Sequence, residues 1–279
     1  MPICHATGIA YDRAGPTDDA GTVVLIHAGI ADRRMWDPQW SHLTVRHDTV
    51  RLDLRGFGES TARPTEAWAP YRDLLETLRA LEVERADLVG CSYGAGVAVE
   101  AALAEPGRVA SLLLCAPGGS LLAEETGQLA AFVAAEDAAL ERGDVEAAVE
   151  ANLAWWVDGP DGPADRVAPR MRAAVATMQR RAFEITADWD DVDELEIELE
   201  PGPDQRYGEI AVPTLVLCGD LDVDAVTAAA ACLTDGIQDA RSITWPGTAH
   251  LPSMERPDSF LTLLEEWLEE RGTGLSSTS

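Results

Sequence analysis

Short apolar stretches alternate with longer segments of helical periodicity along most of the chain. Six of the short stretches are rich in Val, Leu, Ile and Thr and predict buried strands, at Thr22 to His27, Thr49 to Leu54, Ala86 to Cys91, Ser111 to Ala116, Pro213 to Cys218 and Arg241 to Trp245. Helices are predicted at Trp68 to Leu81, Tyr93 to Ala104, Val223 to Leu233 and Pro257 to Glu270. This order predicts an α/β fold with a mostly parallel, doubly wound sheet flanked by helices.

The stretch from Ser120 to Tyr207 contains no strand-like run. Apolar residues recur there at helical spacing and predict packing surfaces, at Val145, Val149, Leu153 and Trp156, and again at Val167, Met171, Val175, Met178, Ala182 and Ile185. We therefore predict a core domain in two parts, 1–119 and 209–271, with a helical lid at 120–208 inserted before the last two strands and a disordered tail at 272–279. Residues 184–200 carry nine carboxylates and no basic residue, which predicts a solvated, partly mobile linker.

Composition places the chain among globular proteins, because 279 residues with 46% hydrophobic side chains can bury a sizeable core. The five cysteines are widely spaced and form no C-x-x-C pair, which fits a reducing compartment and argues against a zinc site. No apolar run approaches the ~20 residues that span a bilayer, and Met1 to Ala10 has neither a basic nor a continuous apolar region. A soluble, cytoplasmic protein is expected.

The net charge of −28 makes nucleic acid and anionic membranes unlikely partners. A solvated acidic surface explains most of this surplus, and a small molecule is the expected partner. Glycine-rich phosphate loops are absent from the sequence, so we expect no nucleotide, and neither a cofactor nor a metal is predicted. The sequence leaves a homo-oligomer open.

The most informative motif is Gly90-Cys91-Ser92-Tyr93-Gly94, which lies where a predicted strand gives way to a helix. This G-x-S-x-G pattern at a strand-to-helix turn is a nucleophile elbow, in which the serine hydroxyl projects above the sheet edge. Residues two before and two after the serine approach each other closely in such a turn, and glycines at 90 and 94 suit that crowding.

A serine needs a base, and His250 follows the last predicted strand on a loop, where doubly wound sheets place their sites. The other histidines fit the role less well, since His42 and His47 lie in a polar helix-to-strand connection and His27 suits a structural role in its loop. The acid that orients the base is expected just past the fifth strand. We select Asp222 there, with Asp220 and Asp224 as competing candidates.

Two backbone N–H groups are expected to form an oxyanion hole. One belongs to Tyr93, directly after the nucleophile. The other belongs to Gly29 in the turn His27-Ala28-Gly29-Ile30, with Ile30 as the alternative. Trp36, Trp155, Trp156 and Trp189 are candidates for an apolar substrate pocket, although an ordinary place in the core explains them equally well.

Together these motifs resemble the α/β-hydrolase superfamily over nearly the whole chain. The resemblance rests on His27-Ala28-Gly29 with Met35-Trp36, Asp53-Leu54-Arg55-Gly56-Phe57-Gly58-Glu59-Ser60, the Ser92 elbow, Pro213 to Asp222, and Gly247-Thr248-Ala249-His250. It is greatest for the branch of lidded serine esterases, enol-lactonases and cofactor-free haloperoxidases. The order Ser92, Asp222, His250 is the family's nucleophile–acid–base order.

The resemblance implies a helical lid, an acid three residues after Gly219, and a structural role for Arg55. Serine at the elbow, where an aspartate would stand, separates the chain from the family's epoxide hydrolases and haloalkane dehalogenases. The sequence therefore predicts a serine hydrolase that cleaves an ester or lactone of a neutral, largely apolar small molecule through an acyl-enzyme. Carbon–carbon bond hydrolysis, thioester cleavage and lyase or cyclase chemistry can use the same triad, and a non-catalytic ligand receptor is the alternative from another class.

Overall fold

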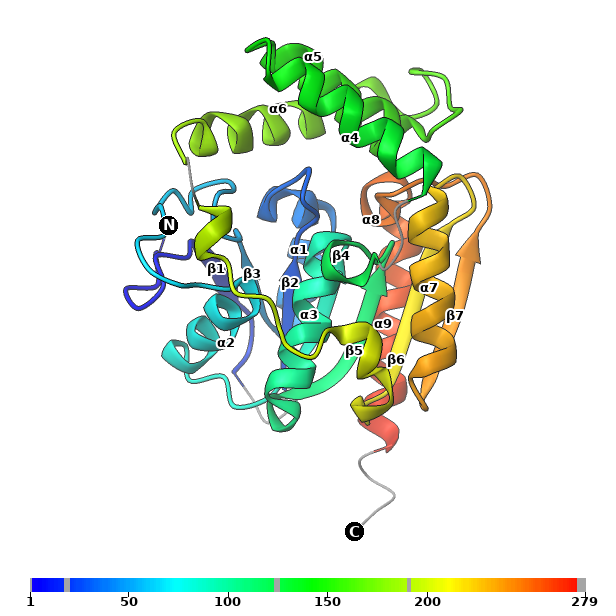
Figure 1. The fold of residues 1–279 in the computed structure, drawn as a ribbon. Coiled ribbons are helices and arrows are strands. Elements are labelled where there is room, and N and C mark those ends of the chain that lie inside the picture. Colours follow the sequence, from blue (N-terminus) through cyan, green and yellow to red (C-terminus); the bar gives the residue numbers. More distant parts are fainter. Residues whose placement is uncertain (1, 18–20, 123–125, 190–191, 275–279) are drawn as a thin grey trace.

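A seven-stranded β-sheet organises the protein (Figure 1), seen in a computed structural model that describes residues 2–17, 21–122, 126–189 and 192–274. The strand order is β1-β3-β2-β4-β5-β6-β7, and the last six of these strands run parallel. β1 pairs antiparallel to β3 at one edge. The strands are β1 (Tyr11–Ala14), β2 (Thr22–Ile26), β3 (Asp48–Leu52), β4 (Ala86–Cys91), β5 (Val109–Cys115), β6 (Thr214–Gly219) and β7 (Ala240–Trp245).

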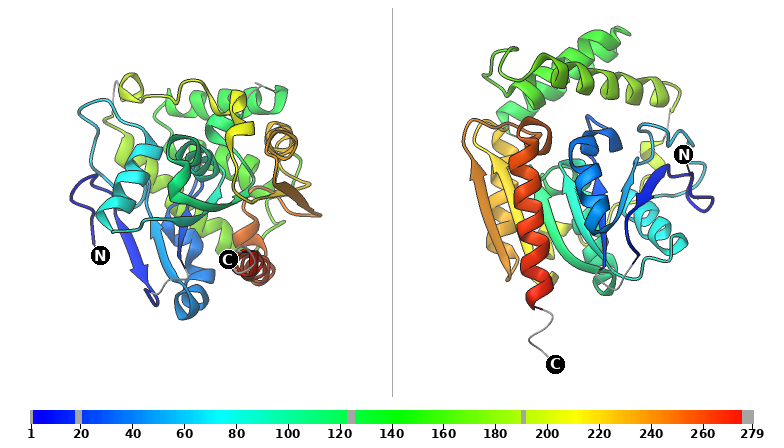
Figure 2. Two further views of the ribbon diagram at one scale, coloured as in Figure 1. Left: turned by 90° about the horizontal axis from the view of Figure 1, so that it is seen from below. Right: turned by 180° about the vertical axis from the view of Figure 1, so that it is seen from behind.

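Helices cover both faces of this sheet, as Figures 1 and 2 show. One face carries α2 (Pro70–Ala80), α3 (Tyr93–Ala104) and α7 (Asp224–Gly236), and the other carries α1 (Asp37–Arg46) and α9 (Pro257–Gly274). β2, β4 and β6 are therefore buried at every residue, which explains why they consist of continuous apolar runs. The predicted α/β architecture with a parallel sheet is confirmed.

A helical insertion separates β5 from β6 in the chain and lies across the carboxyl ends of the strands (Figure 1). We use this name for α4 (Gly127–Leu140), α5 (Val145–Asn152), the π-helix η4 (Leu153–Asp158) and α6 (Pro169–Thr186). After the insertion the chain returns to the sheet, where β6 pairs in parallel with β5 from Leu112↔Thr214 to Cys115↔Leu217. None of the helices in the described ranges is both long and apolar enough to cross a membrane.

β1 and α1 are among the elements that were not predicted from the sequence. β1 is an edge strand whose four residues are all partly exposed, so it lacks the apolar run that marks the other strands. α1 buries only Gln39 and Leu43, so its apolar residues do not recur at a helical spacing that the sequence would show. The connection expected around His42 is therefore wrong, because His42 lies within α1, with its side chain exposed.

The acidic segment 184–200 also differs from the predicted linker. Residues 190–191 lie outside the described residues, but the part that follows is bound to the core. The backbone N–H of Trp68 donates to the carbonyl oxygen of Leu195 at 3.0 Å, and the N–H of Ile197 donates to that of Trp68 at 2.7 Å. At the other end, α9 continues to Gly274, past the predicted start of the tail, and 275–279 lie outside the described residues.

Candidate active site

Ser92 occupies a strained turn between β4 and α3, with φ +54° and ψ −117°. The turn brings backbone segments into contact, and this explains the glycines that flank it. A Cβ at Gly90 would collide with the carbonyl oxygen of Gly94, and one at Gly94 would lie 2.5 Å from the carbonyl oxygens of Ile26 and His27. The sequence therefore folds locally into the elbow that its glycine pattern predicts.

The Ser92 hydroxyl faces a second segment of small residues. A Cβ on Gly118 would lie only 2.9 Å from Ser92 Oγ, so the backbone after β5 approaches the serine side chain closely. The Ser92 N–H donates to Cys115 O at 2.9 Å, and the Gly118 N–H donates to Ser92 O at 3.2 Å. These bonds fix the elbow between two neighbouring strands. Sequence reasoning missed Gly118, although the Pro117-Gly118-Gly119 run after β5 marks a tight approach.

His250 and Asp222 meet at the carboxyl edge of the sheet, and both side chains are buried. The Nδ1 atom of His250 lies 2.9 Å from each carboxylate oxygen of Asp222. Asp222 Oδ1 also accepts the Val223 N–H at 2.8 Å, which orients the carboxylate. A carboxylate at Nδ1 favours the tautomer with its proton on that nitrogen, leaving a lone pair on Nε2.

The backbone of His250 lies beside the elbow, because the Cys91 thiol donates to the His250 carbonyl oxygen at 3.7 Å. Burial raises the pKa of the Cys91 thiol, with further contributions from the charges of Asp222 and Glu255. The structure thus brings together the end of the strand that leads to Ser92, the carboxylate of Asp222 and His250. Cys91 itself stays a neutral thiol within the core.

The competing carboxylates, Asp220 and Asp224, are exposed and bind other groups. Asp220 is exposed and accepts the Gly247 N–H at 2.6 Å. Asp224 is exposed at the start of α7, where it accepts the Thr126 hydroxyl at 2.5 Å. Neither carboxylate contacts His250, so the geometry favours Asp222 among the three candidates.

The turn after β2 lies against Tyr93, the residue that follows Ser92. A Cβ on Gly29 would stand 3.5 Å from Tyr93 Cβ, so these two backbones are neighbours. Within the described part of the chain, the N–H groups of Gly29 and Tyr93 donate to no acceptor. Burial, together with nearby acidic side chains, raises the pKa of the Tyr93 hydroxyl, so the phenol stays neutral.

His27 has a structural environment. Its Nδ1 donates to Ala28 O at 2.8 Å, and its Nε2 accepts the Leu54 N–H at 2.8 Å. Burial lowers the pKa of the His27 ring, which is fully enclosed and edge-on to Phe57. Because both ring nitrogens bind backbone groups, His27 links the loops after β2 and β3 and has no free nitrogen to act as a base.

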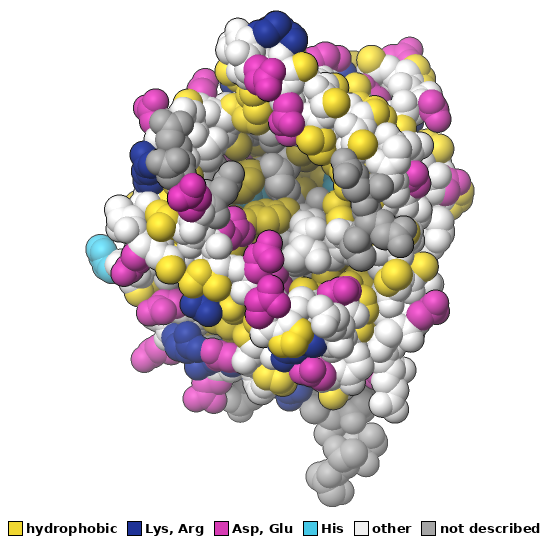
Figure 3. Space-filling model, viewed as in Figure 1, with side chains coloured by type: hydrophobic (Ala, Val, Ile, Leu, Met, Phe, Trp, Pro, Cys, Tyr) yellow, Lys and Arg dark blue, Asp and Glu magenta, His cyan; other side chains and the backbone are white. Residues whose placement is uncertain are grey.

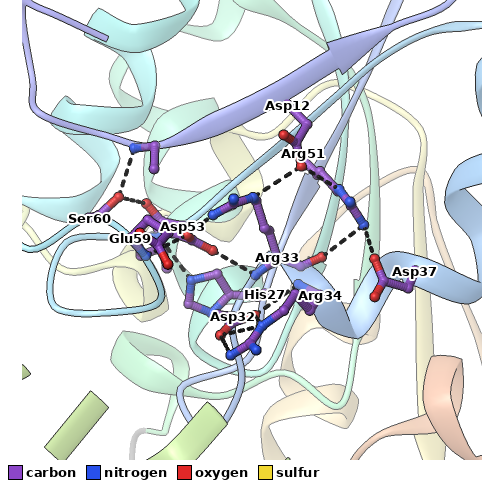
Figure 4. A network of polar contacts seen from close by, with 12 residues as sticks. Asp12, His27, Asp32, Arg33, Arg34, Asp37, Arg51, Asp53, Glu59 and Ser60 are labelled. Carbon is purple, nitrogen blue, oxygen red and sulfur yellow. Dashed lines mark hydrogen bonds and ion pairs between the residues drawn. The ribbon is translucent and has the colours of Figure 1, made fainter. Parts of the chain in front are cut away.

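Asp53 joins these same loops, as the close-up in Figure 4 shows. Its carboxylate accepts the backbone N–H groups of Arg33 and Glu59, each at 2.8 Å, and the Arg33 guanidinium. Burial raises the pKa of the Asp53 carboxyl against the opposing effects of these donors. A Cβ on Gly58 would collide with this carboxylate, which explains the glycine. The network holds the Gly29 turn against the elbow.

Arg55 lies on the far side of this loop. Its guanidinium binds the Asp73 carboxylate through two hydrogen bonds of 2.7 and 2.9 Å and also donates to the carbonyl oxygens of Thr7 and Ala62. These contacts connect the loop after β3 to α2. They fit the structural role that the resemblance implies.

The four candidate tryptophans do not gather in one pocket. Trp156, in the π-helix, packs against His250 with ring centroids 4.5 Å apart and the ring planes inclined by 44°, and Trp155 is half-buried with its ring 6.5 Å from Phe132. Trp189 contacts the loop at Gly56. Trp36 is fully buried against Phe260 of α9, at 5.8 Å between centroids, so it has no surface to offer a substrate.

Phe132 of α4 was missed by the sequence analysis. Its ring packs edge-on to Trp156 at 5.0 Å, so an aromatic pair extends from His250 into the insertion. A single aromatic residue in the alanine-rich segment Gly127–Leu140 is the signal that could have identified it.

A hollow opens below the helical insertion in the space-filling view of Figure 3, with apolar and histidine atoms visible in its depth and acidic side chains below its mouth. Among the described residues, no group of three His, Cys, Asp or Glu side chains is placed to hold a metal. The arrangement supplies a strained serine, a buried Asp–His pair and two neighbouring backbone segments whose N–H groups at Gly29 and Tyr93 donate to no acceptor in the described residues. These are the parts needed for acyl transfer.

Comparisons with known proteins identify the family and the fold of the chain. A family model described as the alpha/beta hydrolase family matches residues 23–263. The chain is 29% identical to a pimeloyl-[acyl-carrier protein] methyl ester esterase of Nitrosospira multiformis, over 86% of this chain and 91% of that protein. It is 21% identical to 3-oxoadipate enol-lactonase 1 of Acinetobacter baylyi, over 91% of each chain. A solved structure of an esterase from Thermogutta terrifontis superposes with a TM-score of 0.76 at 23% identity, covering 95% and 94% of the two chains.

Proposed function

Since the chain belongs to the alpha/beta hydrolase family, we propose that it is a serine hydrolase that cleaves an ester or lactone of a neutral, largely apolar small molecule. The observation that carries this proposal is the buried His250–Asp222 pair beside the Ser92 elbow. An esterase and an enol-lactonase among the similar proteins support the same reaction class.

In the proposed reaction, Nε2 of His250 takes the proton of Ser92 while Oγ attacks the substrate carbonyl carbon. The N–H groups of Tyr93 and Gly29 stabilise the oxyanion that forms. The tetrahedral intermediate expels the alcohol, which receives the proton from His250, and an acyl-enzyme remains. Water, deprotonated by His250, then releases the acid and regenerates Ser92.

Asp222 acts through His250 in this scheme. Its buried carboxylate keeps the imidazole proton on Nδ1 and stabilises the imidazolium that forms in each step. The lone pair on Nε2 is thereby kept available for the Ser92 proton. Both carboxylate oxygens of Asp222 lie 2.9 Å from Nδ1, a distance that suits this double role.

We further propose that the helical insertion acts as a lid. The ring of Trp156 contacts that of His250, and Phe132 packs against Trp156, so the insertion sets an apolar surface against the proposed base. Such a surface excludes water and favours a neutral acyl group over a charged one. An apolar acyl chain or lactone ring fits this environment.

A fluorophosphonate probe tests the proposal, because it phosphonylates only an activated serine. We expect one adduct by intact mass, located on Ser92 by peptide mass spectrometry and absent in Ser92→Ala and His250→Ala. Ser41→Ala and His42→Ala are matched controls, since both side chains are exposed on α1. Turnover of a neutral ester in ¹⁸O-water should place the label in the acid product. A folded wild-type protein without an adduct, or an unlabelled rearranged product, would contradict hydrolysis by Ser92.

A further inference from the structure

The segment that follows the π-helix contacts both loops of the proposed triad. Gly159, with φ +88°, leaves so little room that a Cβ there would lie 2.8 Å from Leu221 O and 3.8 Å from Ala249 Cβ. Leu221 directly precedes the acid Asp222, and Ala249 directly precedes His250. Together with the contact between the rings of Trp156 and His250, this places one end of the helical insertion against the proposed triad.

Arg166 connects this end of the insertion to the histidine loop. Its Nε donates to Asp158 O at 2.8 Å, and its Nη2 donates to Val157 O, the last two residues of the π-helix. Its Nη1 donates to Gly247 O at 3.2 Å and to a carboxylate oxygen of Glu255 at 2.6 Å. The side chain is only 13% exposed, so the guanidinium is enclosed between the two segments that it joins.

Glu255 completes the connection from the other side. One carboxylate oxygen binds Arg166, and the other accepts the N–H of Ala249 at 3.0 Å. Glu255 ends the short helix α8 (Pro252–Glu255), which begins two residues after His250, so its hydrogen bond to Ala249 connects the two sides of the histidine in the chain. The side chain is 4% exposed, and its negative charge is balanced by Arg166.

We propose that Arg166 and Glu255 form a positioning pair for the general-base histidine. The pair fixes the backbone at Ala249, holds the Trp156 turn on the imidazole, and keeps a buried carboxylate next to the triad neutralised. Neither residue touches the substrate, so both act through His250. This inference rests on the proposed function, because it assigns His250 the role of base.

Removing either charge of the pair should shift the pH dependence of kcat/KM, in opposite directions for Arg166 and Glu255. Arg166→Gln leaves the charge of Glu255 unbalanced, and a nearby anion stabilises the imidazolium. The midpoint of the acid limb of the kcat/KM profile should therefore move to higher pH, by about half a unit. Glu255→Gln leaves Arg166 unbalanced and should move the midpoint to lower pH. The double variant should return close to the wild-type midpoint.

The experiment compares these three variants with Arg166→Lys and with the control Arg180→Gln. Arg180 is another arginine of the insertion, but it pairs with the exposed Glu146 far along α6 from the triad loops. We measure kcat and KM for a neutral ester from pH 5 to 9, with circular dichroism to establish folding. We expect kcat at pH 7 to fall about tenfold in each single variant with KM little changed, and Arg166→Lys to keep the wild-type midpoint. Arg180→Gln should change neither quantity.

Midpoints that stay fixed, or that move in the same direction in both single variants, would overturn the proposal and leave the pair a structural role only. If Arg166→Gln fails to fold, the isosteric Glu255→Gln and the double variant still test the signed shift. The proposed function fails in a different way, with no Ser92 adduct on the wild-type protein. In that case the low-field Nδ1–H proton of His250 provides the test by NMR, because it should exchange faster with water in both single variants and unchanged exchange would overturn the pair.

Discussion

Replacing Asp222 by asparagine separates the orientation of His250 from simple packing, because the two side chains have nearly the same shape. In the wild-type structure, Asp222 Oδ1 accepts both the Val223 N–H and the His250 Nδ1–H, while Oδ2 lies 2.9 Å from the same Nδ1. An asparagine that keeps the Val223 hydrogen bond must place its NH₂ group at the Oδ2 position. A donor then stands 2.9 Å from Nδ1, where the wild type has only acceptors.

Asp222→Asn should lower activity because the proposed reaction requires the His250 tautomer with its proton on Nδ1. An NH₂ donor at Nδ1 favours the imidazole with its proton on Nε2, and that form cannot accept the Ser92 proton. The imidazolium of each transition state also loses its counter-charge in a site closed to water. We expect kcat to fall about 10⁴-fold, as the carboxylate-to-amide change does in such triads. This corresponds to about 5 kcal/mol of transition-state stabilisation.

The assay combines ester turnover with the rate of fluorophosphonate labelling, and thermal denaturation establishes that the variant folds. Asp220→Asn is the matched control, because this exposed side chain can still accept the Gly247 N–H after the change. We expect it to stay within about twofold of the wild type. An Asp222→Asn protein within tenfold of the wild-type rate, or a large loss in Asp220→Asn instead, would refute the assignment of the acid.

Two further substitutions test the fold around the site. Gly94→Ala should destabilise the protein by about 3 kcal/mol or more in urea denaturation, because the new Cβ would lie 2.5 Å from the carbonyl oxygens of Ile26 and His27. A loss of stability below about 1 kcal/mol would contradict the close packing of the elbow. Burial raises the pKa of the Glu100 carboxyl to about 7 from an ordinary 4.5, so the folded protein holds this proton more tightly than the unfolded chain. The folded state therefore loses about 3 kcal/mol of stability as the pH rises from 4.5 to 7. Glu100→Gln should therefore unfold at higher urea than the wild type at pH 8 and show no gain at pH 4.5, and equal gains at both pH values would exclude this titration as the cause.

The parts of the fold that sequence could predict are those with a strong local signal. The buried strands β2, β4 and β6 are continuous apolar runs because both of their faces are covered, and the runs were recognised within one or two residues of their ends. β1 and α1 were missed because each has only a small buried surface, and short or half-exposed elements leave little periodicity in the sequence.

In the candidate site too, the residues that sequence could predict are those set by local structure. The Ser92 elbow is a local structure, since the glycines at 90 and 94 are required by contacts within a few residues of the serine and with one neighbouring strand. Asp222 was selected with Asp220 and Asp224 still as competing candidates, because all three follow β6 and only the path of the loop decides which one reaches His250. Arg166 and Glu255 lie 89 positions apart and meet only through the packing of the insertion, so no spacing rule could pair them.

The pairing of β6 with β5 across the helical insertion has a consequence for synthesis on the ribosome. When β5 leaves the exit tunnel, its apolar edge has no partner, because the strand that covers it is encoded about 100 residues later, from Thr214 onward. At about 5–20 residues per second, this edge stays open for about 5–20 seconds. During that interval it can join a strand from another nascent chain. We therefore expect the yield of native protein to depend on chaperones that bind exposed strands, and on the speed at which the codons of the insertion are translated.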